Sequence, residues 1–244
     1  MNRQRGFTLI ELSMVLLIVA LLLGGLLVPL SAQMDARNTQ ESLRRLDEVR
    51  DALLGYAAAH GRLPCPARGD AGDTGIEHPA GGGACTRPWN GFVPAVTLGL
   101  SPTDTQGYLL DGWGNRVRYA LTTAHANAFS TANGLRSIGL SNLAPDLKIC
   151  AQGSAITAPG TAAANCAAAN RLADDAVAVV YSLGRRGSGS GAGSDETHNP
   201  NPNATVAADP AFVGRTEASD FDDLVVWLSA NVLYNRMIAA QQLP

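Results

Sequence analysis

The first thirty residues are mainly apolar and predict a membrane helix. Phe7 to Leu30 contains few polar residues, and no residue from Leu12 to Leu30 is charged. As a helix, these roughly 24 residues would be about 36 Å long, enough to cross a bilayer core of about 30 Å. Arg3 and Arg5 precede them, and basic residues favour the cytoplasmic side, so the remainder is expected to be translocated. The pattern predicts a transmembrane helix over residues 7–32.

The next thirty residues keep the helical period but become amphipathic. Apolar side chains recur every three or four positions, at Leu43, Leu46, Val49, Leu53, Tyr56 and Ala57. Charged residues occupy the other faces, and Gly61 and Pro64 predict the end of the helix. Residues 33–60 are therefore expected to continue the first helix, giving a rod of about 80 Å. A short coiled-coil stalk is the alternative for this half.

Residues 61–244 are expected to form a globular domain rich in loops. Strands are predicted at Arg116–Leu121, Asp174–Leu183 and Phe221–Leu228 from their apolar and β-branched content, followed by a helix at Ser229–Gln242. The expected fold class is α+β. A long N-terminal helix, membrane-spanning and then amphipathic, packs on a small antiparallel sheet, with loop-rich inserts and a short C-terminal helix.

Glu11 interrupts the apolar run one turn from its start. An ionisable residue near the centre of a membrane helix costs about 2.5–3.5 kcal/mol on insertion scales, and less near the interface. Such a residue indicates a function and requires a partner.

The residues around Glu11 carry a resemblance to a known family. Gly6-Phe7-Thr8-Leu9-Ile10-Glu11-Leu12 resembles the signal of type IV prepilins and type II secretion pseudopilins. The resemblance implies that a prepilin peptidase cuts between Gly6 and Phe7, so that residues 1–6 are a leader peptide, and that Phe7 is then methylated. It also implies that Glu11 is the assembly carboxylate, which compensates the N-terminal ammonium of a neighbouring subunit. Such a pair removes the cost of burying each charge alone, but only when the two neighbouring helices are aligned in one axial register.

Three other interpretations of this segment were weighed. A secretory signal cut near Ser31-Ala32 normally has a shorter, uncharged apolar stretch of about 7–15 residues. A plain membrane anchor for a periplasmic enzyme gives no reason for Glu11. A buried helix of a soluble protein rarely runs so long without polar breaks.

Further motifs extend the resemblance into the domain. Asp111 to Tyr119 resembles the Asp-x-Trp-Gly-Asn-x-x-x-Tyr turn of major pseudopilins, which leads into a strand. Ser182–Gly187 and Asp220–Asp223 resemble the two ends of their calcium-binding loop. The chain has extra sequence at about 69–107 and 124–170, which favours a minor or atypical subunit.

Calcium is a candidate ligand of that loop. Acidic residues between Gly184 and Asp223 are Asp195, Glu196, Asp209, Glu217, Asp220, Asp222 and Asp223. Calcium takes six to eight oxygen ligands, so Asp195, Asp220, Asp222 and Asp223 are the candidate set. However, Arg185 and Arg186 stand where the family pattern has an acidic residue, and the spacing is that of no recognised calcium motif. A solvated, flexible loop is the favoured alternative.

Four cysteines, Cys65, Cys85, Cys150 and Cys166, fall on the translocated side. An even number in an oxidising compartment predicts two disulfides, with three possible connectivities. Pairing of sequence neighbours, Cys65 with Cys85 and Cys150 with Cys166, would cross-link the two inserted regions. Each disulfide would then stabilise the fold by about 3 kcal/mol. The absence of a Cys-x-x-Cys pair disfavours zinc.

Catalytic and nucleic-acid-binding signals are missing from the sequence. The net charge of −3 does not indicate a phosphate-binding surface, so nucleic acid is disfavoured as a partner. The four histidines have no helical metal spacing, and no nucleophile motif occurs. The expectation is a non-enzymatic structural subunit of a type II secretion pseudopilus or type IV pilus.

This subunit would be a single-pass protein of the bacterial inner membrane with its domain in the periplasm. Its expected partners are other pilins or pseudopilins, the prepilin peptidase and methyltransferase, the inner-membrane assembly platform, and membrane lipid before assembly. Two rival hypotheses stay open. One is a minor pilin that acts as an adhesin or binds a substrate or DNA, and the other is a membrane-anchored periplasmic enzyme.

Overall fold

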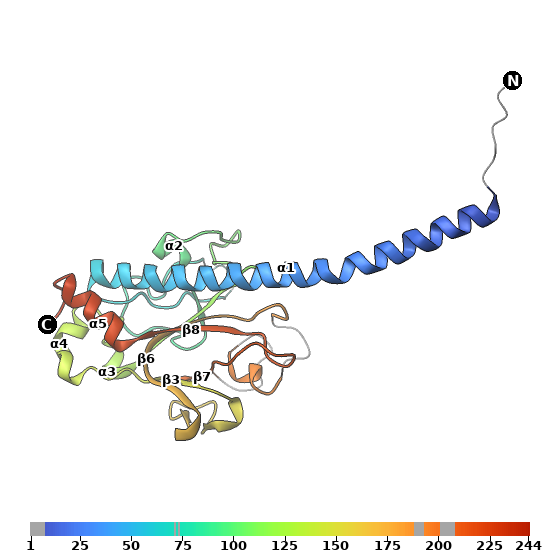
Figure 1. Cartoon of the computed structure of the whole chain (residues 1–244). Helices are drawn as coiled ribbons and strands as arrows, with labels where there is room; N and C mark the ends of the chain where they lie inside the picture. The colour runs from blue at the N-terminus through green and yellow to red at the C-terminus, as the bar shows by residue number, and fades with distance from the viewer. Residues whose placement is uncertain (1–7, 71, 73, 188–192, 201–207) are drawn as a thin grey trace.

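A single long helix, α1, dominates the molecule. The computed structural model describes residues 8–22, 31–70, 72, 74–187, 193–200 and 208–244, and the backbone alone of residues 23–30 (Figure 1). Helix α1 spans Leu9–His60, 52 residues without a break. It ends at Gly61, whose φ of 68° is left-handed and whose N–H donates to the carbonyl of Ala57 at 2.9 Å. The predicted end of the rod is confirmed.

Among the described residues, we found no helix with both the length and the apolar character needed to cross a membrane. The transmembrane assignment of residues 7–32 stays a prediction.

The domain is built on a curled, six-stranded sheet. Its strands are β1 Gly91–Phe92, β2 Arg118–Leu121, β3 Leu147–Cys150, β6 Arg171–Ser182, β7 Ala211–Val213 and β8 Leu224–Ser229. The order is β1-β2-β6-β3-β7, and β8 pairs with β6. Every pairing in this sheet is antiparallel except that of β3 with β7, which is parallel. The sheet is therefore mainly antiparallel, as expected, and the parallel pair was not predicted.

Shorter elements surround this sheet. A two-stranded sheet pairs β4 Ile156–Thr157 with β5 Asn165–Cys166. The remaining helices are α2 Ala95–Leu98, α3 Ala124–Asn127, α4 Gly134–Ile138 and α5 Ala230–Ala239. Short 3₁₀ turns lie at Leu140–Asn142, Gly153–Ala155, Ala168–Asn170 and Glu196–His198.

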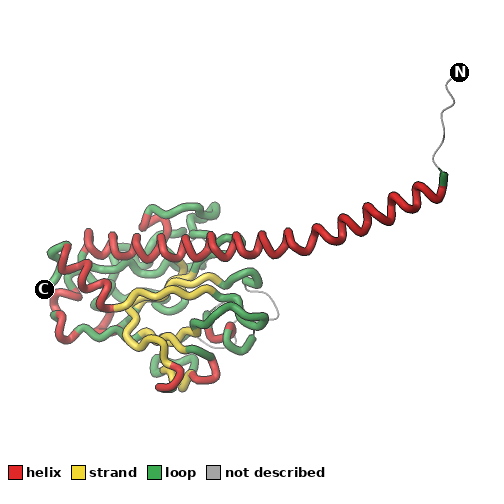
Figure 2. The backbone as a smooth tube through the Cα atoms, viewed as in Figure 1, coloured by secondary structure: helices red, strands yellow, loops and turns green. Residues whose placement is uncertain are grey.

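The second half of α1 packs on one face of the sheet (Figure 2). Leu46, Val49, Leu53 and Ala57 are fully buried there. Burial of a Leu or Val side chain contributes about 1.5–3 kcal/mol, so this contact holds the helix to its own domain. A coiled-coil stalk is therefore not the role of this half.

The buried face of α1 differs from the predicted face at its start. Leu43 is 41% exposed, whereas Ser42 is fully buried. The stripe therefore runs 42, 46, 49, 53 and 57, with a polar residue at its first position. Ser42 lies inward because the chain near Gly112 packs against the helix there, as described below.

Alternate residues of β6 serve two apolar clusters. Ala178 and Val180 face the cluster under α1, while Val179 and Tyr181 face a second cluster on the opposite side with Phe212. This strand is buried on both faces over its second half. It is the central strand, and the predicted strand at Asp174–Leu183 lies almost wholly within it.

The two inserted regions are part of the core. Val93 from the first insert and Phe129 and Leu135 from the second are fully buried in the cluster under α1. Both are also stapled, because disulfides join Cys65 to Cys85 and Cys150 to Cys166, with Cα–Cα distances of 5.4 and 5.5 Å. The pairing of sequence neighbours is the one present.

The C-terminal helix closes the end of the domain. Leu233 and Met237 of α5 are fully buried in the same cluster as α1. Beyond the helix, the Gln242 side-chain amide donates to the carbonyl of Ala58 at 3.1 Å. The end of the chain is thereby fixed to the last turn of α1.

We predict that the second disulfide contributes substantially to stability. Cys150 ends β3 and Cys166 lies in β5, so the bond ties the second insert to the main sheet. Replacing both residues by Ala should lower the free energy of unfolding by about 3 kcal/mol, because the unfolded chain regains the entropy of the open loop. Urea unfolding of the double variant measures this loss. An unchanged unfolding midpoint would contradict the prediction.

Candidate functional site

The first half of α1 presents a long apolar surface. Large apolar side chains from Leu9 to Leu22 are exposed, from 43% at Val19 to 86% at Leu9. This half extends away from the domain in Figure 1. Exposed apolar patches of this extent mark surfaces that bind protein or lipid.

Glu11 lies on this surface and closes the start of the helix. Its carboxylate accepts hydrogen bonds from the N–H and the hydroxyl of Thr8, both at 3.0 Å. In return, the Glu11 N–H donates to the Thr8 hydroxyl oxygen at 3.3 Å, which completes a capping box. Within the described part of the chain, no cationic side chain pairs with Glu11. The predicted processing residues, Gly6 and Phe7, lie outside the described residues.

The turn that begins at Asp111 fixes the domain to α1. Gly112 lies directly against the helix, since a Cβ there would be 2.4 Å from the carbonyl oxygen of Asn38. The Gly112 N–H donates to the Ser42 hydroxyl at 2.9 Å. The Arg45 guanidinium donates to the carbonyls of Leu110 and Asp111, each at 2.8 Å. Ser42, the buried polar residue of α1, is therefore a contact point for this turn.

Asp111 organises the turn from inside. One carboxylate oxygen accepts the N–H groups of Trp113 and Asn115 at 2.9 and 2.8 Å, and the other accepts the Ser182 hydroxyl at 2.5 Å. Burial raises the pKa of Asp111, although these hydrogen bonds oppose the shift. Asn115 donates to the carbonyl of Gly184 at 2.7 Å. The turn thus joins α1 to the end of β6.

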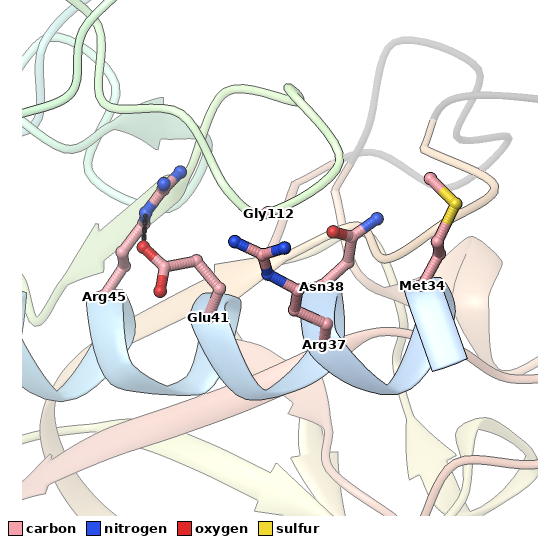
Figure 3. Close-up of a pocket in the computed structure, with 6 residues that line it drawn as sticks. All are labelled: Met34, Arg37, Asn38, Glu41, Arg45 and Gly112. Atoms are coloured by element: carbon pink, nitrogen blue, oxygen red, sulfur yellow. Dashed lines mark hydrogen bonds and ion pairs between the residues drawn. The ribbon is translucent and has the colours of Figure 1, made fainter. Parts of the chain in front are cut away.

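A pocket of about 360 Å³ lies beside this junction (Figure 3). It is lined by Met34, Arg37, Asn38, Glu41, Arg45 and Gly112. Arg45 and Glu41 form an ion pair at 3.0 Å along its wall. The pocket therefore opens where the exposed half of α1 meets the domain.

The acidic loop after β6 forms two separate groups of charges. Asp222 and Asp223 come together with Glu196, and their ligand atoms lie within 4.8 Å of one another. Asp195 and Asp220 instead pair with the guanidinium of Arg215. The four residues predicted as calcium ligands are therefore divided between two groups. Glu196 was named among the loop acids but left out of the candidate set, and the ion pairs with Arg215 were not predicted.

The remaining acids of the loop lie elsewhere. Asp209 accepts N–H groups from Gly160 at 2.6 Å and Ala211 at 2.8 Å, and Glu217 is exposed. Burial raises the pKa of Asp209 and, to about 8, that of Asp223. Asp223 accepts a hydrogen bond from the Asn199 amide at 2.8 Å.

These residues do not fit a calcium ion. Arg186 bonds to Glu196 and lies 3.4 Å from Asp222, so a guanidinium already borders the carboxylates that could hold a metal. A hard cation requires several oxygens that carry no competing charge partner.

The comparisons with known proteins bear on the N-terminus. Residues 1–27 match a family model described as "Prokaryotic N-terminal methylation motif". This segment is a type IV pilin-like prepilin signal. The prepilin signal includes Gly6, Phe7 and Glu11 and the first turns of the exposed half of α1. Neither the curated proteins nor the solved structures gave a match to the chain.

We predict that Gly112→Ala loosens the domain from α1. Its Cβ would meet backbone atoms of Asn38, so the turn has to move and the free energy of unfolding should fall by about 1–3 kcal/mol. Gly55→Ala is the matched control, because nothing lies within 4 Å of its added Cβ. That change should stabilise the helix by about 0.5–1 kcal/mol. Equal effects of both changes in urea unfolding would contradict the prediction.

We predict that Asp223 makes the fold less stable as the pH rises. Between its ordinary pKa of 3.8 and the raised value of about 8, folded Asp223 keeps a proton that the unfolded chain releases. Stability therefore falls across this window. One pKa unit corresponds to about 1.4 kcal/mol. As the pH rises from the ordinary to the raised pKa, the free energy of unfolding of Asp223→Asn should therefore increase by more than about 1 kcal/mol relative to that of the wild type.

Urea unfolding at several pH values measures this gain. The control is Asp174→Asn, whose side chain is 52% exposed and which should keep the wild-type profile. Parallel profiles for Asp223→Asn and the wild type would contradict the prediction.

Proposed function

We propose that this chain is a structural subunit of a type II secretion pseudopilus or type IV pilus. It is cut after Gly6, methylated on Phe7, and assembled through the first half of α1, without catalysis of its own. The observation that carries this proposal is a prepilin signal on a helix whose apolar residues 9–22 are exposed and project from a folded domain.

The two halves of α1 serve different surroundings in this proposal. Before assembly, the apolar half lies in the inner membrane, and afterwards it packs among the same segments of neighbouring subunits. The second half is buried in its own domain and carries that domain on the periplasmic side. Two disulfides suit that oxidising compartment.

Glu11 supplies the specificity of assembly. Its described hydrogen bonds are all to Thr8, and none of these neutralises the charge. Inside a fibre of apolar helices, an unpaired carboxylate is costly, whereas one paired with a neighbour's N-terminal ammonium is not. The pair forms only when adjacent helices have the correct axial offset. Glu11 therefore selects the register.

The inserts favour a structural subunit over an appended binding module. Val93, Phe129 and Leu135 are core residues under α1, so neither insert is a separate unit attached to a finished domain. The adhesive or substrate-binding minor pilin is the second candidate. It would require a ligand surface on the outside of these stapled regions.

We predict that the mature protein begins at methylated Phe7 in cells that have the prepilin peptidase. In cells without this enzyme, residues 1–6 should remain attached. N-terminal sequencing with mass spectrometry of the purified protein makes this measurement. A mature chain that begins beyond Ala32 would overturn the processing step.

Glu11→Ala tests the assembly step separately. The variant should be processed normally, yet its recovery in sheared fibres should fall tenfold or more, since breaking a buried ion pair costs about 3–5 kcal/mol. Glu48→Ala is the matched control, because Glu48 lies on the same helix and pairs with Arg44, one turn away, at 3.4 Å. Wild-type incorporation of Glu11→Ala would overturn the assembly role of this carboxylate.

A further inference from the structure

Three buried carboxylates lie close together at the end of the domain near β8. Glu196, Asp222 and Asp223 are 3%, 7% and 4% exposed, and their ligand atoms are within 4.8 Å of one another. Asp223, with its pKa raised to about 8, keeps its proton at neutral pH, but negative charges on Glu196 and Asp222 disfavour one another in a buried site unless a positive charge compensates them. The identity of that positive charge decides whether the loop needs a metal.

Arg186 provides a positive charge from within the chain. Its guanidinium bonds to the Glu196 carboxylate and lies 3.4 Å from one oxygen of Asp222. Its backbone N–H donates to the other Asp222 oxygen at 2.9 Å. The guanidinium also donates to the carbonyl of Ser219 at 2.7 Å. One residue therefore connects the start of the loop to its last turn.

The backbone of the loop is shaped around this contact. Gly184 has a φ of 62°, and a Cβ there would be 2.2 Å from the carbonyl oxygen of Asp222. The Asp222 N–H donates to the same Glu196 carboxylate at 2.8 Å. The two ends of the loop thus approach directly, backbone against backbone, beside Arg186.

A second arginine occupies the other acids. Arg215 bonds to Asp195 at 2.7 Å and also to Asp220, and the second Asp195 oxygen accepts the Gly153 N–H at 2.7 Å. Asp195 and Asp220 are therefore held in a separate ion-pair network.

We infer that Arg186 is the internal cation of this loop, and that it excludes divalent cations from the Glu196, Asp222 and Asp223 carboxylates. An arginine stays protonated at every physiological pH, so this charge is permanent and independent of the calcium concentration. Removal of the guanidinium leaves three convergent acidic side chains, which offer calcium the oxygen ligands that it prefers when the ion displaces the proton of Asp223. The inference holds whether or not the chain assembles into a fibre.

Thermal unfolding of the full-length chain in detergent, after treatment with chelator, tests this inference. The wild type should keep the same Tm with and without millimolar CaCl2, or MgCl2 in its place. Arg186→Ala should unfold several degrees lower in chelator, and CaCl2 should restore at least half of the loss, because a ligand that binds only the folded state stabilises it. MgCl2 should restore less, since it demands a stricter octahedral geometry.

Arg185→Ala is the matched control. Arg185 is the adjacent arginine but pairs with Asp35 of α1 at 3.0 Å, and its side chain is 63% exposed. This variant should have no calcium response. A Tm of the wild type that rises with CaCl2 would overturn the inference, as would Arg186→Ala that lacks a calcium response.

If Arg186→Ala does not fold in chelator, its recovery in CaCl2 alone supports the inference. Failure in both conditions moves the test to Arg186→Lys, which keeps the positive charge and should unfold at a lower Tm without responding to calcium. If CaCl2 restored the whole Tm loss of Arg186→Lys, a positive charge at this position would not exclude the ion, and the inference would be overturned. Calorimetric titration of the wild type with CaCl2 gives an independent result, and heat of binding at this loop would overturn the inference.

Discussion

Helix α1 is exposed and apolar in its first half and buried against the domain in its second half. The arrangement of the whole molecule follows from this contrast. The backbone of α1 satisfies its own hydrogen bonds, so the helix continues from its exposed apolar half into the protein core without a change of structure. Leu46, Val49, Leu53 and Ala57 make the second half the inner wall of the domain. The sheet, the inserts and α5 are then arranged around this wall.

The parts of the fold that could be predicted are those with a local signal. The end of α1 follows from Gly61 and Pro64, and the strand around Val179 and Val180 from its run of β-branched residues. Strands β3 and β7 were not predicted. They are short and pair in parallel across about sixty residues of sequence, as Lys148 opposite Ala211. Such a pairing leaves no periodic pattern in either segment.

The same distinction applies to the sites. The Glu11 motif is contiguous in sequence, so it could be identified before the structure. The loop after β6 could not be resolved in this way, because Asp195 and Glu196 are neighbours in the chain but point to different arginines. Arg186 was noted only as a departure from a family pattern. Its contacts with Glu196 and Asp222 depend on the fold that brings residues 186, 196 and 222 together.

The unbroken course of α1 has a mechanical consequence. Since no linker separates its first turn from Ala57, a force applied to the exposed half is transmitted through the helix directly into the centre of the domain. The turn at Gly112, seated against Asn38, resists sliding of the helix within the domain. A displacement at the start of the helix is therefore carried through α1 to the far end of the domain.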